Sequence, residues 1–229
     1  QNELPMEPVS GIGRNEVIEE DDTKEIKKIA LTFDVAWGNS DTEQIINILN
    51  ENNIKATFFI TGEWVSKYPE DVKKYFENGH EIGNHSDSHP YPTKITINEL
   101  INDATECKNK IEKVTGTAPT LYRAPYGDYN DTVVATVNGM GYKMIQWDCD
   151  SLDWKDISAE EINRRIINNV GSGSILLFHT DKENTHSALV DLIPYLQGEG
   201  YKFVTVSELF KRKGITPDPK EHKMWTYVE

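Results

Sequence analysis

Seven short apolar runs alternate with segments of helical periodicity, and this alternation constrains the fold of the 229-residue chain more than any other feature. The runs have the length of buried strands, and the segments between them carry apolar residues at helical spacing. Such an alternation predicts a parallel sheet covered by helices, because right-handed crossovers bring every strand back in the same direction. The pattern fits a barrel or a doubly wound sheet and does not choose between them. The predicted strands are residues 29–33, 56–60, 81–85, 120–123, 142–147, 174–178 and 202–206.

Three of the predicted helices begin at a capping-box pattern, in which Ser or Thr is followed three residues later by Glu. The pairs are Ser40 and Glu43, Thr96 and Glu99, and Ser158 and Glu161. We therefore expect helices to start next to Ser40, Thr96 and Ser158.

The alternation occupies residues 27–213, a length that suits one domain. Residues 1–26 contain Pro, Gly and a run of acidic residues without any helical or strand period, so we interpret them as an acidic linker or arm. Residues 214–229 are interpreted as a peripheral C-terminal tail. The sequence does not indicate an oligomeric state.

Composition excludes two classes of partner. The net charge of -14 argues against nucleic acid and anionic membranes, because both would repel the protein. The sequence contains no apolar stretch of membrane-spanning length. It begins at Gln1 without an apolar signal segment, so we expect any signal or anchor to have been removed. Cys107 and Cys149 are interpreted as separate buried residues, with a disulfide as the alternative.

Polar side chains follow several of the predicted strands at the point where each strand ends. In barrels of parallel strands the carboxyl ends of the strands carry the active site, so we expect these residues to meet there. They are Asp34, His85, Arg123, Asp150, Asp153 and His179.

His85 and His89 lie four residues apart at the end of the third predicted strand. Neutral imidazole is a good ligand for zinc and similar divalent ions. The pair at this position therefore predicts a metal site, and the alternative is a turn that carries two surface imidazoles.

Asp34 and Arg123 are candidates for a linked pair. A carboxylate directly after a buried strand can act as a general base or a metal ligand, or it can simply cap a turn. Arg123 leaves the sheet before a Pro-Tyr-Gly turn and can hold a carboxylate through a bidentate bond, which would lower the pKa of Asp34.

His179 ends the sixth predicted strand and is a candidate general acid. If Asp150 or Asp153 pairs with the imidazole, the pKa of His179 rises and the residue can act as a general acid near neutral pH. Trp154 would then form a wall of the pocket, although a Trp is equally common in a core. A structural histidine whose hydrogen bonds are satisfied is the alternative for His179.

Taken together, these motifs resemble those of the NodB-homology polysaccharide deacetylases, carbohydrate esterase family 4. The resemblance covers residues 27–212 and is nearest to the bacterial branch that acts on peptidoglycan, including sporulation-type deacetylases. The matching motifs are Thr32-Phe33-Asp34, His85-Ser86-Asp87-Ser88-His89, Arg123-Ala124-Pro125-Tyr126, Asp150-Ser151-Leu152-Asp153-Trp154 and Leu177-Phe178-His179.

The resemblance implies a single NodB-like domain folded as a deformed (β/α)7 barrel, a divalent ion and hydrolysis of the N-acetyl group of a β-1,4-linked sugar. We expect zinc, with cobalt or nickel as alternatives. By resemblance Asp34 is the base, Arg123 tethers it, and His179 is the acid, supported by Asp153 in preference to Asp150. His85 and His89 are the implied metal ligands. The implied substrate-binding residues are Tyr126, whose amide would stabilise the oxyanion, Pro125, Trp154 and Leu177.

Val35 departs from the family pattern. The usual opening has two adjacent Asp residues, of which the second binds the metal, and Val35 stands at that second position. Water could complete the ion's shell, or Asp34 could bind the ion itself, and Asp87 is a weaker candidate. We therefore expect a metal that is bound more weakly and exchanges more readily than in the two-Asp form.

The leading interpretation is a deacetylase of N-acetylglucosamine or N-acetylmuramic acid in peptidoglycan. An acetylxylan esterase or a chitin deacetylase is the alternative within the same chemistry. A glycan-binding protein without catalysis is the alternative of another class, suggested by Val35. By resemblance the partner is a polysaccharide and the location is extracellular or at the cell surface.

Overall fold

The computed structural model describes residues 27–211, and its strands form a curled sheet in which every pairing is parallel. The order is β5-β4-β3-β2-β1-β7-β6, and β8 pairs with β1 beside this path. No pairing joins β5 to β6 among the described strands, so the barrel is open there. The strands are β1 Lys27–Val35, β2 Thr57–Ile60, β3 Glu81–Asn84, β4 Leu121–Tyr122, β5 Lys143–Met144, β6 Cys149–Asp150, β7 Ile175–His179 and β8 Tyr201–Val204. This arrangement confirms the deformed (β/α)7 barrel.

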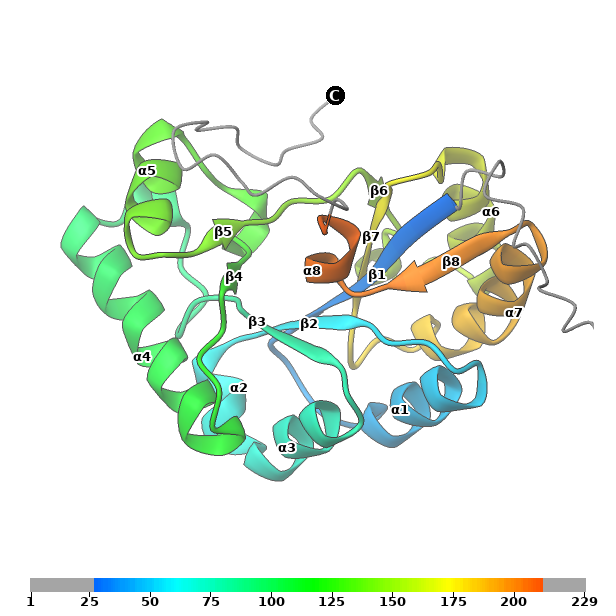
Figure 1. Ribbon diagram of the computed structural model, residues 1–229, viewed down its shortest axis with the longest axis horizontal. Coiled ribbons are helices and arrows are strands. Elements are labelled where there is room, and N and C mark those ends of the chain that lie inside the picture. The colour runs from blue at the N-terminus through cyan, green and yellow to red at the C-terminus, as the bar shows by residue number, and fades with distance from the viewer. Residues whose placement is uncertain (1–26, 212–229) are drawn as a thin grey trace, which may run out of the picture.

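Helices surround the outer side of the sheet, with α4 and α5 at one end and α6 and α7 at the other (Figure 1). None of the described helices has the length and apolar character of a membrane span. The helices are α1 Thr42–Glu51, α2 Gly62–Lys67, α3 Pro69–Glu77, α4 Ile97–Thr115, α5 Asp131–Gly139, α6 Ala159–Asn169, α7 Thr185–Gly198 and α8 Val206–Leu209, with 3-10 turns η1 Pro92–Lys94, η2 Pro125–Gly127 and η3 Asp153–Lys155.

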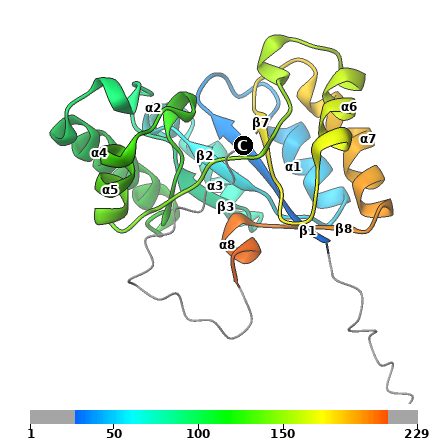
Figure 2. The same cartoon turned by 90° about the horizontal axis from the view of Figure 1, so that it is seen from above.

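Strand β1 is the centre of the sheet and separates two apolar layers. Because side chains alternate along a strand, Leu31 and Phe33 face the helices while Ala30 faces the interior of the barrel. The inner layer also contains Val206. Helix α8, to which Val206 belongs, lies at the edge of the sheet where β1 begins (Figure 2). The opposite edge of the sheet, where the strands end, is left for polar groups.

Two of the three predicted capping boxes have the expected N-cap. Thr96 and Glu99 form the full reciprocal box at α4, and the Ser158 hydroxyl accepts from the Glu161 amide at α6. The box at Ser40 is wrong: Asp41 is the N-cap of α1, and Ser40 instead donates to the carboxylate of Asp181 at 2.7 Å.

The sequence reasoning missed the short strand β6, the short helix α2 and the 3-10 turns η1 and η3. The predicted strand 142–147 is present only as Lys143–Met144, and β6 follows as a separate two-residue strand. The predicted linker 1–26, the end of the predicted domain at 213 and the tail 214–229 lie outside the described residues.

Candidate active site

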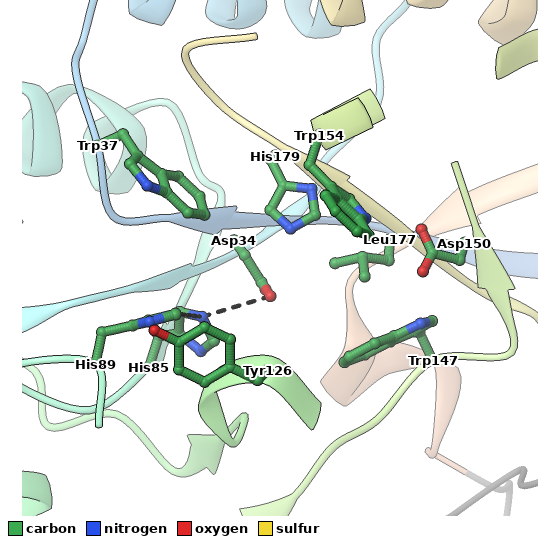
Figure 3. A pocket seen from close by; sticks show the side chains of 10 residues that line it. All are labelled: Asp34, Trp37, His85, His89, Tyr126, Trp147, Asp150, Trp154, Leu177 and His179. Atoms are coloured by element: carbon green, nitrogen blue, oxygen red, sulfur yellow. Dashed lines mark hydrogen bonds and ion pairs between the residues drawn. The ribbon is translucent and has the colours of Figure 1, made fainter. Parts of the chain in front are cut away.

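A pocket of about 410 Å³ lies at the edge of the sheet where the strands end. Figure 3 shows side chains from several loops converging on it around Asp34. Its lining contains eight of the predicted site residues and adds Trp37 and Trp147. The predicted members are Asp34, His85, His89, Tyr126, Asp150, Trp154, Leu177 and His179. Arg123 and Asp153 lie buried behind this lining, and Pro125 is buried in η2.

Arg123 is fully buried and holds Asp34 in place. Its Nη1 atom donates to Asp34 Oδ1 at 2.9 Å and to Thr32 Oγ1 at 2.8 Å, while Nη2 donates to the carbonyl of Gln146 at 3.3 Å. The contact with Asp34 is thus a single hydrogen bond and not the bidentate pair predicted, because the other nitrogen serves Gln146. The guanidinium also packs over the Phe59 ring at 4.1 Å.

The pKa of Asp34 is lowered. Burial alone would raise it, but the interactions with His85 and Arg123, together with the hydrogen bond from Arg123, outweigh burial. Asp34 is therefore an ionised carboxylate that faces the pocket, which suits a proton acceptor.

His85 and His89 point their ring nitrogens toward each other. His85 Nδ1 donates to the carbonyl of Arg123 at 2.8 Å, so its Nε2 atom carries the lone pair and faces the pocket. The two Nε2 atoms are 3.2 Å apart, and His85 Nε2 lies 3.5 Å from Asp34 Oδ2. Burial lowers the pKa of both imidazoles, that of His89 to about 4, so both are neutral.

Two neutral imidazoles with converging nitrogens fit the histidine half of a divalent-metal site. Among residues 27–211 no group of three or more His, Cys, Asp or Glu side chains is arranged to hold a metal ion. Val35 packs in the apolar layer under the helices, on the face of β1 opposite to Asp34. The carboxylate of Asp87 is also engaged, because it accepts from Lys110 Nζ at 2.7 Å.

The loop that carries the two histidines is held in a strained conformation. Ser86 and His89 have left-handed backbones, with φ of 73° and 59°. The Ser86 hydroxyl accepts from the His89 amide at 2.9 Å. At the start of α2, the Gly62 amide donates to the Ser86 carbonyl at 3.0 Å. These bonds fix the loop and, with it, the direction of both rings.

His179 is paired with Asp153. Its Nδ1 atom lies 2.7 Å from Asp153 Oδ1, and Asp153 Oδ2 accepts from the His179 amide at 2.8 Å and from the Thr185 hydroxyl at 2.6 Å. Burial would lower the pKa of His179, but the hydrogen bond and charge of Asp153 outweigh burial and raise it. Asp150 instead accepts from the Leu152 amide at 2.8 Å and lines the pocket.

Aromatic rings form much of the remaining wall. Trp37 approaches both His89 and His179 edge-on, with ring centroids 6.1 and 5.6 Å away. Tyr126 sits in η2 with a left-handed backbone, φ 60°. Trp37 and Trp147 were missed by the sequence reasoning, although Trp37 comes three residues after Asp34 and Trp147 ends a predicted strand. Their positions near the ends of predicted strands were the only sequence signal, and such a position does not distinguish a pocket tryptophan from a core one.

A family model for polysaccharide deacetylases matches residues 21–145, more than half of the chain. The chain belongs to the polysaccharide deacetylase family. The match confirms the resemblance found in the motifs, but it does not test the predicted domain limits at residues 27 and 213.

Relatives of this deacetylase family include curated proteins and solved structures. Peptidoglycan-N-acetylmuramic acid deacetylase PdaC of Bacillus subtilis is 38% identical over 183 residues, covering 80% of this chain and 38% of that protein. A peptidoglycan-N-acetylglucosamine deacetylase of Bacillus cereus is 38% identical over 192 residues, covering 82% of this chain and 90% of that protein. The chain spans about two fifths of the length of PdaC. The crystal structure of BA3943 from Bacillus anthracis, described as a CE4 family pseudoenzyme, has a TM-score of 0.78 at 31% identity and covers 80% of this chain and 65% of that one.

Proposed function

We propose that this chain is a hydrolase that removes N-acetyl groups from cell-wall polysaccharide, with N-acetylglucosamine or N-acetylmuramic acid of peptidoglycan as the substrate. The observation that carries the proposal is the placement of a proton acceptor and a proton donor on one pocket. Asp34 has a lowered pKa and His179 a raised one. Hydrolysis of an amide needs both, a base for the attacking water and an acid for the departing amine. The names of PdaC and of the Bacillus cereus relative support the choice of substrate.

In this mechanism Asp34 takes a proton from the attacking water while Arg123 keeps its carboxylate in position. His179, oriented by Asp153, gives a proton to the nitrogen of the leaving amine. The backbone amide of Tyr126 stabilises the oxyanion that forms on the carbonyl. Trp154 and Leu177 contact the sugar, and Pro125 fixes the turn that presents Tyr126.

His85 and His89 are the residues that would hold a divalent ion, zinc in the first place and cobalt or nickel as alternatives. Such an ion supplies a Lewis acid for the carbonyl and lowers the pKa of water bound to it. Asp34 lies close enough to His85 to act as a further ligand, at the cost of its role as base.

A glycan-binding protein without catalysis is the competing function. Two observations favour it: Val35 cannot ligate a metal, and the similar structure of BA3943 is described as a pseudoenzyme. Against it, Asp34, Arg123 and His179 are all present with the hydrogen bonds that acid and base chemistry requires. We also propose action at the cell surface or outside the cell, where a cell-wall polysaccharide is reached.

A mass-spectrometric assay on N-acetylglucosamine oligomers, peptidoglycan fragments and acetylxylan, with added zinc or cobalt, tests the proposal. We expect a loss of one acetyl group per event from the amino sugars, and a decrease of roughly 10²- to 10⁴-fold in kcat for Asp34→Ala, since the base is removed. Asp191→Ala, an exposed aspartate of α7, is the matched control and should keep full activity.

The assay also separates the alternatives. Reaction on acetylxylan alone would identify an esterase. Binding of glycan fragments without any loss of acetyl would identify the non-catalytic protein. Full activity of Asp34→Ala would show that the mechanism is wrong.

A further inference from the structure

Two stacked tyrosines extend the aromatic wall beyond the pocket on the side of His89. The rings of Tyr91 and Tyr126 are parallel within 8°, with centroids 3.9 Å apart. Tyr126 lines the pocket and meets His89 edge-on at 4.5 Å, so Tyr91 lies one ring further out. Both rings remain open to solvent, Tyr91 by 50% and Tyr126 by 56%. An apolar surface that begins inside a pocket and continues outside it is typical of a binding site.

The stack is built rigidly from two separate loops. Tyr91 precedes η1 and Tyr126 lies within η2. The carboxylate of Asp128 ties the loops together, because it accepts from the Thr93 amide at 2.9 Å and from the Thr93 hydroxyl at 2.7 Å. Tyr126 is fixed further by its left-handed backbone. Rings held in advance lose little conformational entropy when a ligand packs on them.

We propose that Tyr91 forms a second sugar subsite, against which the sugar unit next to the reacting one packs. The inference rests on the proposed function, because it takes the pocket to hold one acetylated sugar of a polymer. That polymer has to continue out of the pocket, and the wall on the His89 side continues into Tyr91. A pyranose has an apolar face of C–H bonds and a rim of hydroxyls, and a half-exposed tyrosine offers it an apolar ring and a polar hydroxyl.

Tyr91 is distinct from the proposed catalytic residues. Among the contacts described for residues 27–211, Tyr91 touches neither Asp34 nor His179, so Tyr91 takes no part in the proposed proton transfers. It should act only on substrates long enough to reach it. Its removal should therefore change KM for long oligomers and leave kcat and the shortest substrate unchanged.

The test measures kcat, KM and calorimetric binding for N-acetylglucosamine oligomers of two to six units. In the wild type kcat/KM should rise with length. Tyr91→Ala should lose this rise, with KM and the dissociation constant for the longest oligomer about five- to tenfold higher, the range expected for one aromatic contact. Tyr91→Phe keeps the ring and should retain most of the gain. Tyr195→Ala, a tyrosine of α7 that is 46% exposed, is the matched control and should change nothing.

Other results would overturn the inference. If Tyr91→Ala lowered kcat equally for oligomers of every length, Tyr91 would only support Tyr126. No change in KM or in binding for any oligomer would mean that no subsite exists there. If the wild type removes no acetyl group, the proposed function fails. Calorimetric binding of the oligomers then tests by itself whether Tyr91 forms a sugar subsite. Weaker binding of long oligomers to Tyr91→Ala would support the subsite, and unchanged or absent binding would overturn it.

Discussion

Arg123 organises both halves of the site from one buried position. Its guanidinium holds the carboxylate of Asp34, and its backbone carbonyl accepts from His85 Nδ1 and so fixes the tautomer of that ring. A buried guanidinium is costly unless its donors are paired. Here both Nη atoms donate, to Asp34, Thr32 and the Gln146 carbonyl, while the buried Nε atom has no partner among the described residues. The proposed base Asp34 and the imidazole of His85 are therefore positioned by the same residue.

The pair of His179 and Asp153 leads to a prediction about pH. The pKa of His179 is raised despite burial, because the hydrogen bond and charge of Asp153 outweigh it. If His179 must be protonated to act, activity falls as the pH rises through this raised pKa. Asp153→Asn removes the negative charge, so the alkaline limb of the kcat profile should move to lower pH, and kcat should fall by roughly 10²- to 10⁴-fold.

Asp150→Asn serves as the comparison for this pH profile. The charge of Asp150 also raises the pKa of His179, but by less than the hydrogen bond and charge of Asp153 do, so the limb should move less. A larger displacement with Asp150→Asn than with Asp153→Asn would contradict the assignment of Asp153 as the partner of the imidazole.

Most residues of the site could be predicted from their positions near strand ends. The strand pattern alone does not choose between Asp150 and Asp153 as the partner of His179, and the preference for Asp153 came from the family resemblance. The conformation of the loop between the two aspartates selects Asp153. The loop turns through the left-handed backbone of Leu152 and brings the Asp153 carboxylate into contact with His179. Trp37 could not be told from a core tryptophan, since its exposure depends on where the loop after β1 runs.

At the level of elements, the short helix α2 anchors the loop of His85 and His89. The amides of Gly62 and Glu63 donate to the carbonyls of Ser86 and Asp87, both at 3.0 Å. There is no space for a side chain at Gly62, because a Cβ atom would lie 1.8 Å from Asp87 Oδ1 and 3.0 Å from the Cα atom of Cys107 in α4.

Gly62→Ala should therefore destabilise the protein by about 1–3 kcal/mol, the usual cost of overpacking, and also lower activity, since the loop must shift. Urea denaturation measures the free energy of unfolding. Gly198→Ala is the matched control at the end of α7. A Cβ atom there would meet nothing within 4 Å beyond its own helical turn, so the variant should be neutral or stabilise by about 0.4–1 kcal/mol. Equal stability of the two variants would contradict the steric argument.

The larger elements could be predicted because their periodicity spans many residues, whereas the short ones could not. Strands β1 and β7 and helices α4 and α6 follow the apolar pattern closely. The two-residue strand β6 and the six-residue helix α2 are too short to show a period. The cap at Ser40 was wrong because its hydroxyl is used by Asp181, which is 141 positions away in the sequence.

At the scale of the whole molecule, the curl of the sheet determines which groups can meet at the pocket. Asp34 on β1 lies opposite Phe59 on β2 and His179 on β7, so the two site residues Asp34 and His179 are direct neighbours across the sheet. Val35 faces the helices, so the proposed metal site relies on the two imidazoles of His85 and His89. Any metal affinity of this site depends on folding, because the two proposed ligands come together only in the folded state.

Thermal unfolding with and without zinc measures that affinity without reference to activity. A ligand that binds the folded state stabilises it by RT ln(1 + [L]/Kd), so a Kd of about 10 μM gives about 1.4 kcal/mol at about 100 μM zinc. We expect Tm to rise by roughly 3–6 °C. A nanomolar Kd would give about 7 kcal/mol and a far larger rise, which would contradict a site with two protein ligands. His89→Ala should abolish the rise, whereas His186→Ala, a histidine of α7 outside the pocket lining, should retain it.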